Sequence, residues 1–386
     1  MTALLRALPI PSGQRVLDLL PTLRDVLDGT GPAVLPVPAD DPRETERLAS
    51  ALRPGEPIDD EIAVVVATSG TTGVPKGAQL SAAALRASGS ATHSFLGGPG
   101  GWLLALPAHH IAGLQVLLRS VLAGTEPVVL DVSGGFDPAD LVPGIERMTG
   151  PRRYTSLVPT QLVKALDDPA ATAALADLDA VLLGGAATPV PLRERAEAAG
   201  ITIVRTYGMS ETCGGCVYNG IPLDGVRVRI AEDGRVLLGG TVLATSYRGL
   251  PDHPAFAQPG WFRTDDAGAV QDGVLSVLGR LDEAISTGGL TVVPQVVEAV
   301  LTTHPGVREC AIVGLPDARL GERVVAAVVP TGTPPTLDEL RKHVTDQLDP
   351  TAAPRELQLL DALPLRGPGK VDRVALRAAL AAHDGN

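Results

Sequence analysis

The chain has 386 residues, a formal net charge of −12, and a composition that is 45% hydrophobic, 20% charged and only 3% aromatic. This length is too great for one small core and predicts two or three domains, and the composition is that of a globular protein rather than a disordered one. The negative charge argues against nucleic acid or an anionic membrane surface as a partner, because both attract basic surfaces.

Targeting and membrane signals do not stand out in the sequence. Met1 to Leu20 hold no basic cluster followed by an unbroken apolar run, and no stretch of the chain approaches the ~20 apolar residues of a membrane span. Three cysteines, an odd count, do not make a disulfide framework. We therefore expect a cytoplasmic protein without a membrane span, and a homodimer is one option for its assembly.

In chain order, the segment up to about Pro57 reads as irregular, with short amphipathic pieces broken by Pro and Gly. Residues 62–67 then predict a buried strand that runs into a Gly/Thr-rich loop, and a small-residue helix from about Ser81 to Ser90 follows. Helix-like and strand-like stretches alternate from Trp102 to Val204, with strands at 155–158 and 180–183. That alternation favours α/β layers.

The pattern changes near Gly220. Short, Gly-punctuated pieces such as 226–230 and 235–238 predict a β-rich subdomain at about 220–278. Helices at 293–302 and 337–347 with strands at 309–313 and 324–329 then predict a final α+β unit. The expected fold class is α/β: a large N-terminal domain of residues 1–280 that includes the β-rich subdomain, and a small C-terminal α+β domain of residues 281–386.

The loop of residues 68–77 is the first feature that carries chemistry. It holds three glycines, one lysine (Lys76) and four hydroxyl side chains, so backbone N–H groups, hydroxyls and an ammonium can surround phosphate oxygens. The glycine spacing is not that of a Walker A loop. A Gly/Thr-rich surface turn is the alternative, but the expected strand before the loop and helix after it favour triphosphate binding. The residues assigned to it are Thr68, Ser69, Gly70, Thr71, Thr72 and Lys76.

Two further motifs lie where predicted strands end. Gly184 and Gly185 could let a flat base lie against the backbone, Tyr207 offers a ring for stacking, and Glu211 could hold Mg²⁺ against phosphates. A Tyr-Gly turn on its own is common and would carry no such meaning. His109 and His110 are adjacent, so their side chains diverge and no matching ligand set accompanies them; a pocket-lining histidine or a structural one is favoured over a metal site.

The last two motifs supply carboxylates and a second glycine-flanked lysine. Asp266 suits a ribose diol, and Arg280 could donate to the same sugar, although single residues of these types are usually surface ion-pair partners. Lys370 lies in Pro-Leu-Arg-Gly-Pro-Gly-Lys, and only four lysines occur in the whole chain. A mobile ammonium there could stabilise charge that builds up on a carboxylate and a phosphate, whereas a solvated tail lysine is the alternative.

Taken together, the ordered motifs at 68–77, 107–113, 207–212, 261–289 and 364–373 resemble the adenylate-forming superfamily of acyl-CoA synthetases, luciferases and peptide-synthetase adenylation domains. The resemblance runs from about Val64 to the C-terminus. It implies ATP, Mg²⁺ and coenzyme A as ligands, a carboxylate substrate, and a C-terminal domain that is mobile.

The same resemblance implies roles for individual residues. Lys370 would bridge the substrate carboxylate and the α-phosphate, His110 would stand beside the acyl pocket, and Asp282 would be the hinge. Gly184, Gly185 and Ala186 would line the adenine site, and Ser210 would contact phosphate. The nucleotide site as a whole would also include Thr206, Tyr207, Gly208, Met209, Asp266 and Arg280, with Glu211 as the Mg²⁺ ligand.

Two positions depart from the family pattern: Asp265 stands where the family usually has Gly, and Gln295 where Glu often follows Pro. Only 67 residues precede Thr68, and the segment 206–225 is similar to that of actinobacterial o-succinylbenzoate–CoA ligases of menaquinone biosynthesis. This resemblance implies o-succinylbenzoate as the acid. Ser156, Thr188 and Arg205 are candidates, by position, for holding its second carboxylate.

Other interpretations remain open from the sequence. Cys213 and Cys216 could form a redox or zinc pair, although no second pair exists and a small pocket lining is favoured. Another aryl-CoA ligase or an adenylate-forming amide synthase would share the chemistry. A nucleotide-binding protein that has lost catalysis is the different-class alternative, which the presence of both Glu211 and Lys370 disfavours.

Overall fold

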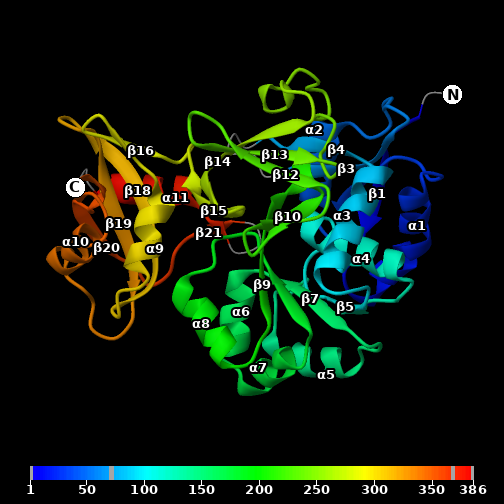
Figure 1. Cartoon of the computed structure of the whole chain (residues 1–386), viewed down its shortest axis with the longest axis horizontal. Coiled ribbons are helices and arrows are strands. Elements are labelled where there is room, and N and C mark those ends of the chain that lie inside the picture. The colour runs from blue at the N-terminus through cyan, green and yellow to red at the C-terminus, as the bar shows by residue number, and fades with distance from the viewer. Residues whose placement is uncertain (1–2, 69–73, 367–369, 384–386) are drawn as a thin grey trace.

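The computed structural model describes residues 3–68, 74–366 and 370–383. Figure 1 shows the N-terminal strands and helices on one side of the molecule, the central sheet with its helices below, and the C-terminal unit on the opposite side. Within the described ranges, none of the helices has the length and apolar character needed to cross a bilayer.

The first residues form regular structure, so the expectation of an irregular start was wrong. A four-stranded sheet has the order β1 (Arg6–Ile10), β2 (Val34–Pro38), β3 (Ile62–Thr68), β4 (Lys76–Ser81), and η1 (Gly13–Leu19), α1 (Leu20–Asp28) and α2 (Pro42–Leu52) connect its strands. The prolines of β2 had argued against an inner strand. β2 pairs with β3 only at Val34 and Val64. Pro36 and Pro38 lie beyond this pair, so their missing N–H groups interrupt no hydrogen bond to β3.

The Gly/Thr-rich loop closes a hairpin instead of opening a helix. Strands β3 and β4 are antiparallel, and their register begins with the pair Thr68 and Lys76 at the two ends of the loop. The predicted helix follows only after β4, as α3 (Ala82–Phe95), where the Ser81 side chain accepts a hydrogen bond from the Ala84 N–H. The strand–loop–helix expectation was therefore wrong, because Lys-Gly-Ala-Gln-Leu-Ser holds no β-branched or aromatic residue that would indicate a strand.

The central sheet has the order β11-β10-β9-β8-β7-β5-β6 and is parallel from β6 to β9. Its strands are β5 (Gly101–Leu104), β6 (Val128–Val129), β7 (Arg153–Leu157), β8 (Ala180–Leu183), β9 (Ile203–Met209), β10 (Gly214–Tyr218) and β11 (Ile221–Pro222). The surrounding helices are α4 (Ile111–Ala123), η2 (Pro138–Asp140), α5 (Leu141–Glu146), α6 (Pro159–Leu166), α7 (Pro169–Ala176), α8 (Val190–Ala198) and η3 (Ser210–Thr212).

Alternation along the strands of this sheet produces two separate cores. On β8, Ala180 and Leu182 join one apolar cluster while Val181 and Leu183 join the other, because successive side chains point to opposite faces. The predicted α/β layering and the strands at 155–158 and 180–183 are confirmed.

The β-rich subdomain is an antiparallel sheet in the order β12 (Val226–Ile230), β13 (Arg235–Gly240), β14 (Trp261–Gln271), β15 (Val274–Arg280), with the short turn η4 (Pro254–Phe256) between β13 and β14. The strands predicted at 226–230 and 235–238 are confirmed. β14 and β15 place Asp266 opposite Arg280.

The last unit is a mixed sheet with helices, as expected. It contains β16 (Ile285–Thr287), β17 (Leu290–Val292), β18 (Val307–Asp317), β19 (Gly321–Pro330) and β20 (Glu356–Leu359), the hairpin β21 (Leu365–Arg366) and β22 (Lys370–Val371), and the helices α9 (Pro294–Leu301), α10 (Leu337–Thr345), η5 (Pro350–Ala352) and α11 (Arg373–His383). It has its own two apolar clusters. Since β15 ends at Arg280 and β16 begins at Ile285, we propose that the domain boundary lies near residue 281.

Candidate functional site

Two neighbouring parallel strands, β8 and β9, bring the Gly184 and Tyr207 motifs to one edge of the central sheet. A Cβ on Gly184 would lie 2.3 Å from Thr206 Oγ1, so this position must be glycine for the two strand ends to pack. Gly185 has φ +82°, a left-handed conformation that glycine adopts without strain. Ala186 follows on the surface. Ligands of open α/β sheets bind at such carboxyl ends.

Tyr207 and Asp266, from motifs 59 residues apart, meet in one hydrogen bond. The Tyr207 hydroxyl donates to Asp266 Oδ2 at 2.6 Å. Burial raises the pKa of the Asp266 carboxyl, and the bond from Tyr207 and the charge of Arg280 oppose that rise. Burial and the neighbouring Asp266 also raise the pKa of Tyr207, so the hydroxyl stays a donor. The tyrosine therefore positions the carboxylate that was predicted to bind a ribose.

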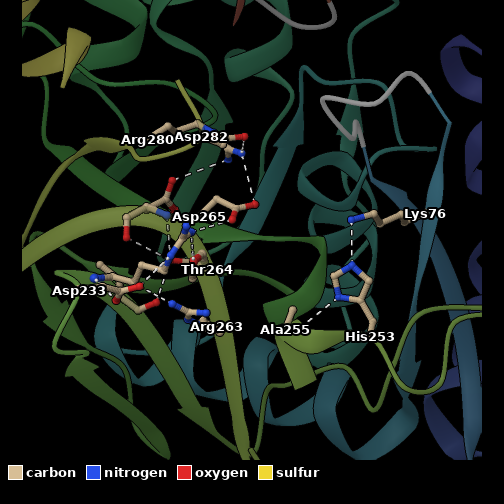
Figure 2. A network of polar contacts seen from close by, with 12 residues as sticks. Lys76, Asp233, His253, Ala255, Arg263, Thr264, Asp265, Arg280 and Asp282 are labelled. Carbon is tan, nitrogen blue, oxygen red and sulfur yellow. Dashed lines mark hydrogen bonds and ion pairs between the residues drawn. The ribbon is translucent and has the colours of Figure 1, made fainter. Parts of the chain in front are cut away.

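Arg280 lies among three carboxylates at the end of β15 (Figure 2). Its Nε and Nη2 donate to Asp282 at 2.8 and 2.6 Å, while Nη1 is 3.7 Å from Asp266 Oδ1. The bidentate contact fixes the plane of the guanidinium. The predicted ribose ligands and the predicted hinge residue are thus in one cluster.

Asp265, which stands where the family usually has Gly, lies on the exposed face of β14. Strand alternation exposes Asp265 and buries Asp266, and Asp265 Oδ1 accepts from Arg235 Nη1 at 2.8 Å. A longer contact of 3.7 Å joins Asp265 Oδ2 and Arg280 Nη2. The extra carboxylate is therefore neutralised on the outside of the strand rather than placed beside Asp266.

A second cluster surrounds Lys76, the lysine of the phosphate loop. Lys76 Nζ is 3.1 Å from His253 Nε2 and lies over the Tyr247 ring, 5.2 Å from its centroid. The Tyr247 hydroxyl donates to Glu211 Oε1 at 2.5 Å. The predicted phosphate-binding lysine and the predicted metal ligand are therefore joined through Tyr247, which the sequence analysis did not single out, and neither was His253.

Glu211 fits a magnesium ligand that shares its ion with a nucleotide. Its side chain is buried, which raises the pKa of the carboxyl, and the bond from Tyr247 opposes that rise. A cation would relieve the cost of burying this charge. Mg²⁺ is usually held by one or two carboxylates together with substrate phosphates. In the described ranges no group of three or more His, Cys, Asp or Glu side chains converges.

Other predicted residues lie around these clusters. Ser210, next to Glu211, donates from Oγ to the Ala67 carbonyl at 3.4 Å, which brings η3 to the end of β3. His110 is the N-cap residue of α4, without a side-chain capping hydrogen bond, and its ring centroid is 4.1 Å from that of His109, so the expectation that these two side chains diverge was wrong. Gly208 packs so closely on β10 that a Cβ would lie 2.0 Å from the Gly214 carbonyl oxygen. The assigned residues Ser69, Gly70, Thr71 and Thr72 lie outside the described residues.

Helix α4, which follows His110, carries a buried arginine that sequence reasoning missed. Arg119 is 3% exposed; its Nη2 donates to the Tyr218 hydroxyl at 3.2 Å, and its guanidinium lies 5.2 Å from the Trp102 ring centroid. Among the described residues its Nε has no hydrogen-bond partner, and Tyr218 is the one acidic group whose charge acts on the guanidinium. Burial lowers the pKa of the guanidinium.

One turn earlier on the same helix, Gln115 Oε1 is also buried without a partner, while Gln115 Nε2 donates to the Cys213 carbonyl at 2.7 Å. Buried polar atoms without partners are rare and often mark the place of a ligand or water. An arginine within the apolar run Leu-Leu-Arg-Ser-Val-Leu was the signal available in the sequence.

The residues just after the strand of Lys370 contact the segment that follows Asp282. Arg373, just beyond β22, contacts Glu283 Oε2 through Nε at 2.8 Å, and Gln295 Nε2 donates to the same oxygen at 2.6 Å. Gln295 Oε1 accepts from the Arg280 N–H at 3.2 Å. An amide can accept and donate at once, whereas an ionised glutamate could not donate to Glu283. This contact explains the glutamine at position 295.

Cys213 and Cys216 are both buried free thiols. Burial raises the pKa of Cys216 to about 12, so the group is a thiol rather than the thiolate that zinc binding or exchange requires. Both thiols lie within apolar clusters, which disfavours the redox or zinc pair, and the pocket-lining interpretation stays a prediction.

Comparison with known proteins places these motifs in a family of nucleotide-binding enzymes. Residues 11–243 match the AMP-binding enzyme family, and residues 296–370 match the AMP-binding enzyme C-terminal domain. A probable 2-succinylbenzoate–CoA ligase of Mycobacterium tuberculosis is 61% identical over 377 residues, which is 96% of this chain and 97% of the relative.

Solved structures show the same architecture. The o-succinylbenzoate CoA synthetase of Bacillus subtilis, in complex with its acyl-adenylate intermediate, has a TM-score of 0.75 at 26% identity and covers 98% of this chain and 88% of its own. ATP-bound MatB from Rhodopseudomonas palustris has a TM-score of 0.85 at 23% identity and covers 98% of this chain and 89% of its own. At this identity the likeness supports the fold of this chain and nothing beyond it. From the extent of these matches and the ordered motifs, the chain belongs to the AMP-binding enzyme family.

Proposed function

We propose that this chain is a 2-succinylbenzoate–CoA ligase of menaquinone biosynthesis. The aliphatic carboxylate of the acid attacks the α-phosphorus of ATP, pyrophosphate leaves, and an acyl-adenylate forms. The thiol of CoA then attacks the acyl carbon and AMP leaves. The full-length similarity to the mycobacterial ligase carries this proposal, and the two polar clusters around Arg280 and Lys76 support it.

The clusters suggest how ATP is held. Tyr207, Asp266 and Arg280 form a half-buried polar edge with a carboxylate that can accept from both ribose hydroxyls. Lys76 lies at the end of the phosphate loop and would meet the phosphates. Glu211 would hold Mg²⁺, which supplies positive charge against the triphosphate when bound. The glycines at 184 and 185 leave backbone open beside Tyr207 for the base.

Arg119 is the residue we assign to the second carboxylate of the acid. That substrate carries a ring carboxylate as well as the reacting aliphatic one, and a buried anion needs a cation. Arg119 is buried, lacks a carboxylate partner among the described residues, and has Nε without a hydrogen bond. It lies on α4, which begins beside His110, the residue assigned to the acyl pocket. Ser156, Thr188 and Arg205 are weaker candidates because none of them offers a buried cation.

The second half-reaction is assigned to a movement of the C-terminal unit. Asp282 lies between β15 and β16, where few residues connect the two sheets, and we propose it as the hinge. Lys370 would serve adenylate formation and then move away so that CoA can reach the acyl-adenylate. A cytoplasmic location would suit these ligands and remains a prediction.

The proposal is tested by incubating the purified protein with ATP, Mg²⁺, CoA and a panel of acids that contains 2-succinylbenzoate, benzoate, malonate and a fatty acid. We expect AMP and the CoA thioester to form in equal amounts and fastest with 2-succinylbenzoate. A faster reaction with another acid would exclude this substrate. A parallel incubation replaces CoA with an amine: product formation with the amine but not with CoA would indicate an amide synthase. No AMP with any acid would indicate a protein that only binds nucleotide.

A further inference from the structure

His253 lies at the start of η4 and touches two donors (Figure 2). The Ala255 N–H donates to His253 Nδ1 at 3.2 Å, and Lys76 Nζ lies 3.1 Å from Nε2 on the other side of the ring. The ring packs edge-on against Tyr247, with centroids 4.7 Å apart. Both Lys76 and His253 are partly exposed, so a ligand can approach the pair from solvent.

The arrangement around His253 has one hydrogen-bond donor too many. A ring nitrogen that accepts a hydrogen bond carries no proton, so the bond from Ala255 places the proton of a neutral His253 on Nε2. That proton then points at the Lys76 ammonium, which has three donors and no acceptor. The other tautomer only moves the conflict to the Ala255 N–H. In either case two donors face each other.

The ring is also unsuited to relieving the conflict by changing charge. Burial and the nearby Lys76 lower the pKa of His253, and the more distant Asp265 opposes that effect, so the imidazole stays neutral near pH 7. Tyr247 contacts both partners and holds them in place. Two converging donors are satisfied together by one anionic oxygen with several lone pairs.

We propose that His253 is a phosphate-binding residue that forms, with Lys76, a two-donor clamp for the terminal phosphates of ATP and for the pyrophosphate that leaves. The inference rests on the proposed function, since that supplies the triphosphate. Figure 2 shows the Lys76–His253 pair well apart from Arg280 and Asp282, which stand at the end assigned to the nucleoside. The clamp therefore faces the opposite end of the nucleotide.

Two substitutions separate the two functions of the ring. His253→Asn keeps an acceptor at the place of Nδ1 for the Ala255 N–H and removes the donor at Nε2. His253→Gln places an amide donor near Nε2 and removes that acceptor. Binding of ATP, pyrophosphate and AMP is measured by calorimetry on the full chain, without any acid. H253N should weaken ATP and pyrophosphate about tenfold or more, because a hydrogen bond to a charged group is lost, and should change AMP less than about twofold. H253Q should stay close to wild type for all three.

The outcomes distinguish this inference from the proposed function. If wild type bound neither ATP nor pyrophosphate, both would fail. If wild type bound them and H253N bound them equally well, or lost AMP as strongly as ATP, only the clamp would be wrong. A loss in H253Q equal to that in H253N would show that a donor at the place of Nε2 does not restore phosphate binding, and would overturn the clamp. Nitrogen-15 NMR of wild type needs no variant: pyrophosphate should shift the Nε2 signal of His253, and an unmoved signal would contradict the clamp.

Discussion

Replacing Arg119 with methionine should weaken the use of 2-succinylbenzoate and stabilise the protein without ligands. The two effects have one origin, because Arg119 is a buried cation with no carboxylate partner among the described residues. Among the described residues its polar and ring contacts are the Tyr218 hydroxyl at 3.2 Å and the Trp102 ring at 5.2 Å. On our account the ring carboxylate of the substrate completes its coordination.

The size of both effects can be estimated from these contacts. Leaving a buried carboxylate without its cation costs about 3–5 kcal/mol, which lowers kcat/KM about 100-fold to several thousand-fold. In the free protein no ion pair of the described residues is lost with the buried charge, and the Trp102 contact is worth about 2 kcal/mol. Methionine is apolar and of similar length, so we expect the free energy of unfolding to rise by about 1–3 kcal/mol.

The assay compares two acids in the thioester reaction. Wild type should prefer 2-succinylbenzoate to 4-oxo-4-phenylbutanoate, which has the same skeleton but no ring carboxylate. R119M should lose that preference, and the two changes should be strongly non-additive. Arg205→Met is the matched control, since Arg205 is exposed on β9 and was a candidate from the sequence. The reasoning is refuted if R119M keeps the preference or if R205M loses it.

Three further changes test other parts of the account. Lys370→Ala should abolish adenylate formation, seen as ATP–pyrophosphate exchange, and leave thioester formation from supplied acyl-adenylate largely intact. If the variant kept both half-reactions, Lys370 would have no catalytic role. Asp265→Gly should change the KM for ATP less than about threefold because its ion pair is exposed, whereas Asp266→Asn should raise it at least about tenfold; equal effects would place Asp265 at the ribose. Burial holds the pKa of His93 at about 4 in the folded state. Only the unfolded chain then takes up this proton between about pH 6.5 and 4, so wild type should lose about 2 kcal/mol of stability from pH 7 to pH 5 that His93→Gln does not lose in urea denaturation.

Much of the fold follows from patterns within single segments. The strand at 180–183 is a short apolar run between turn signals, and it appears as β8 with the same bounds. The first strands were missed because prolines interrupt them, and the pairing that tolerates Pro36 and Pro38 depends on β1 and β3, which are distant in sequence. Strand β4 could not be separated from the loop before it because its residues, Lys-Gly-Ala-Gln-Leu-Ser, include no β-branched or aromatic side chain.

The candidate site, too, could be predicted from the sequence only in part. Tyr207, Asp266 and Arg280 could be chosen from their motifs, because a family resemblance preserves residue types at fixed places. The hydrogen bond between Tyr207 and Asp266 could not be predicted, since β9 and β14 belong to different sheets. Arg119 and His253 were missed because nothing in a sequence shows that a cation lacks a partner or that two donors converge. Those are properties of packed side chains.

The central claim is that the aliphatic carboxylate of 2-succinylbenzoate attacks the α-phosphorus of ATP. Oxygen-18 placed in that carboxylate tests it directly when the AMP released in a complete reaction is analysed by mass spectrometry. The account predicts one oxygen-18 atom in each AMP, and none when the ring carboxylate carries the label instead. Unlabelled AMP from the aliphatic label, or labelled inorganic phosphate with ADP, would contradict it.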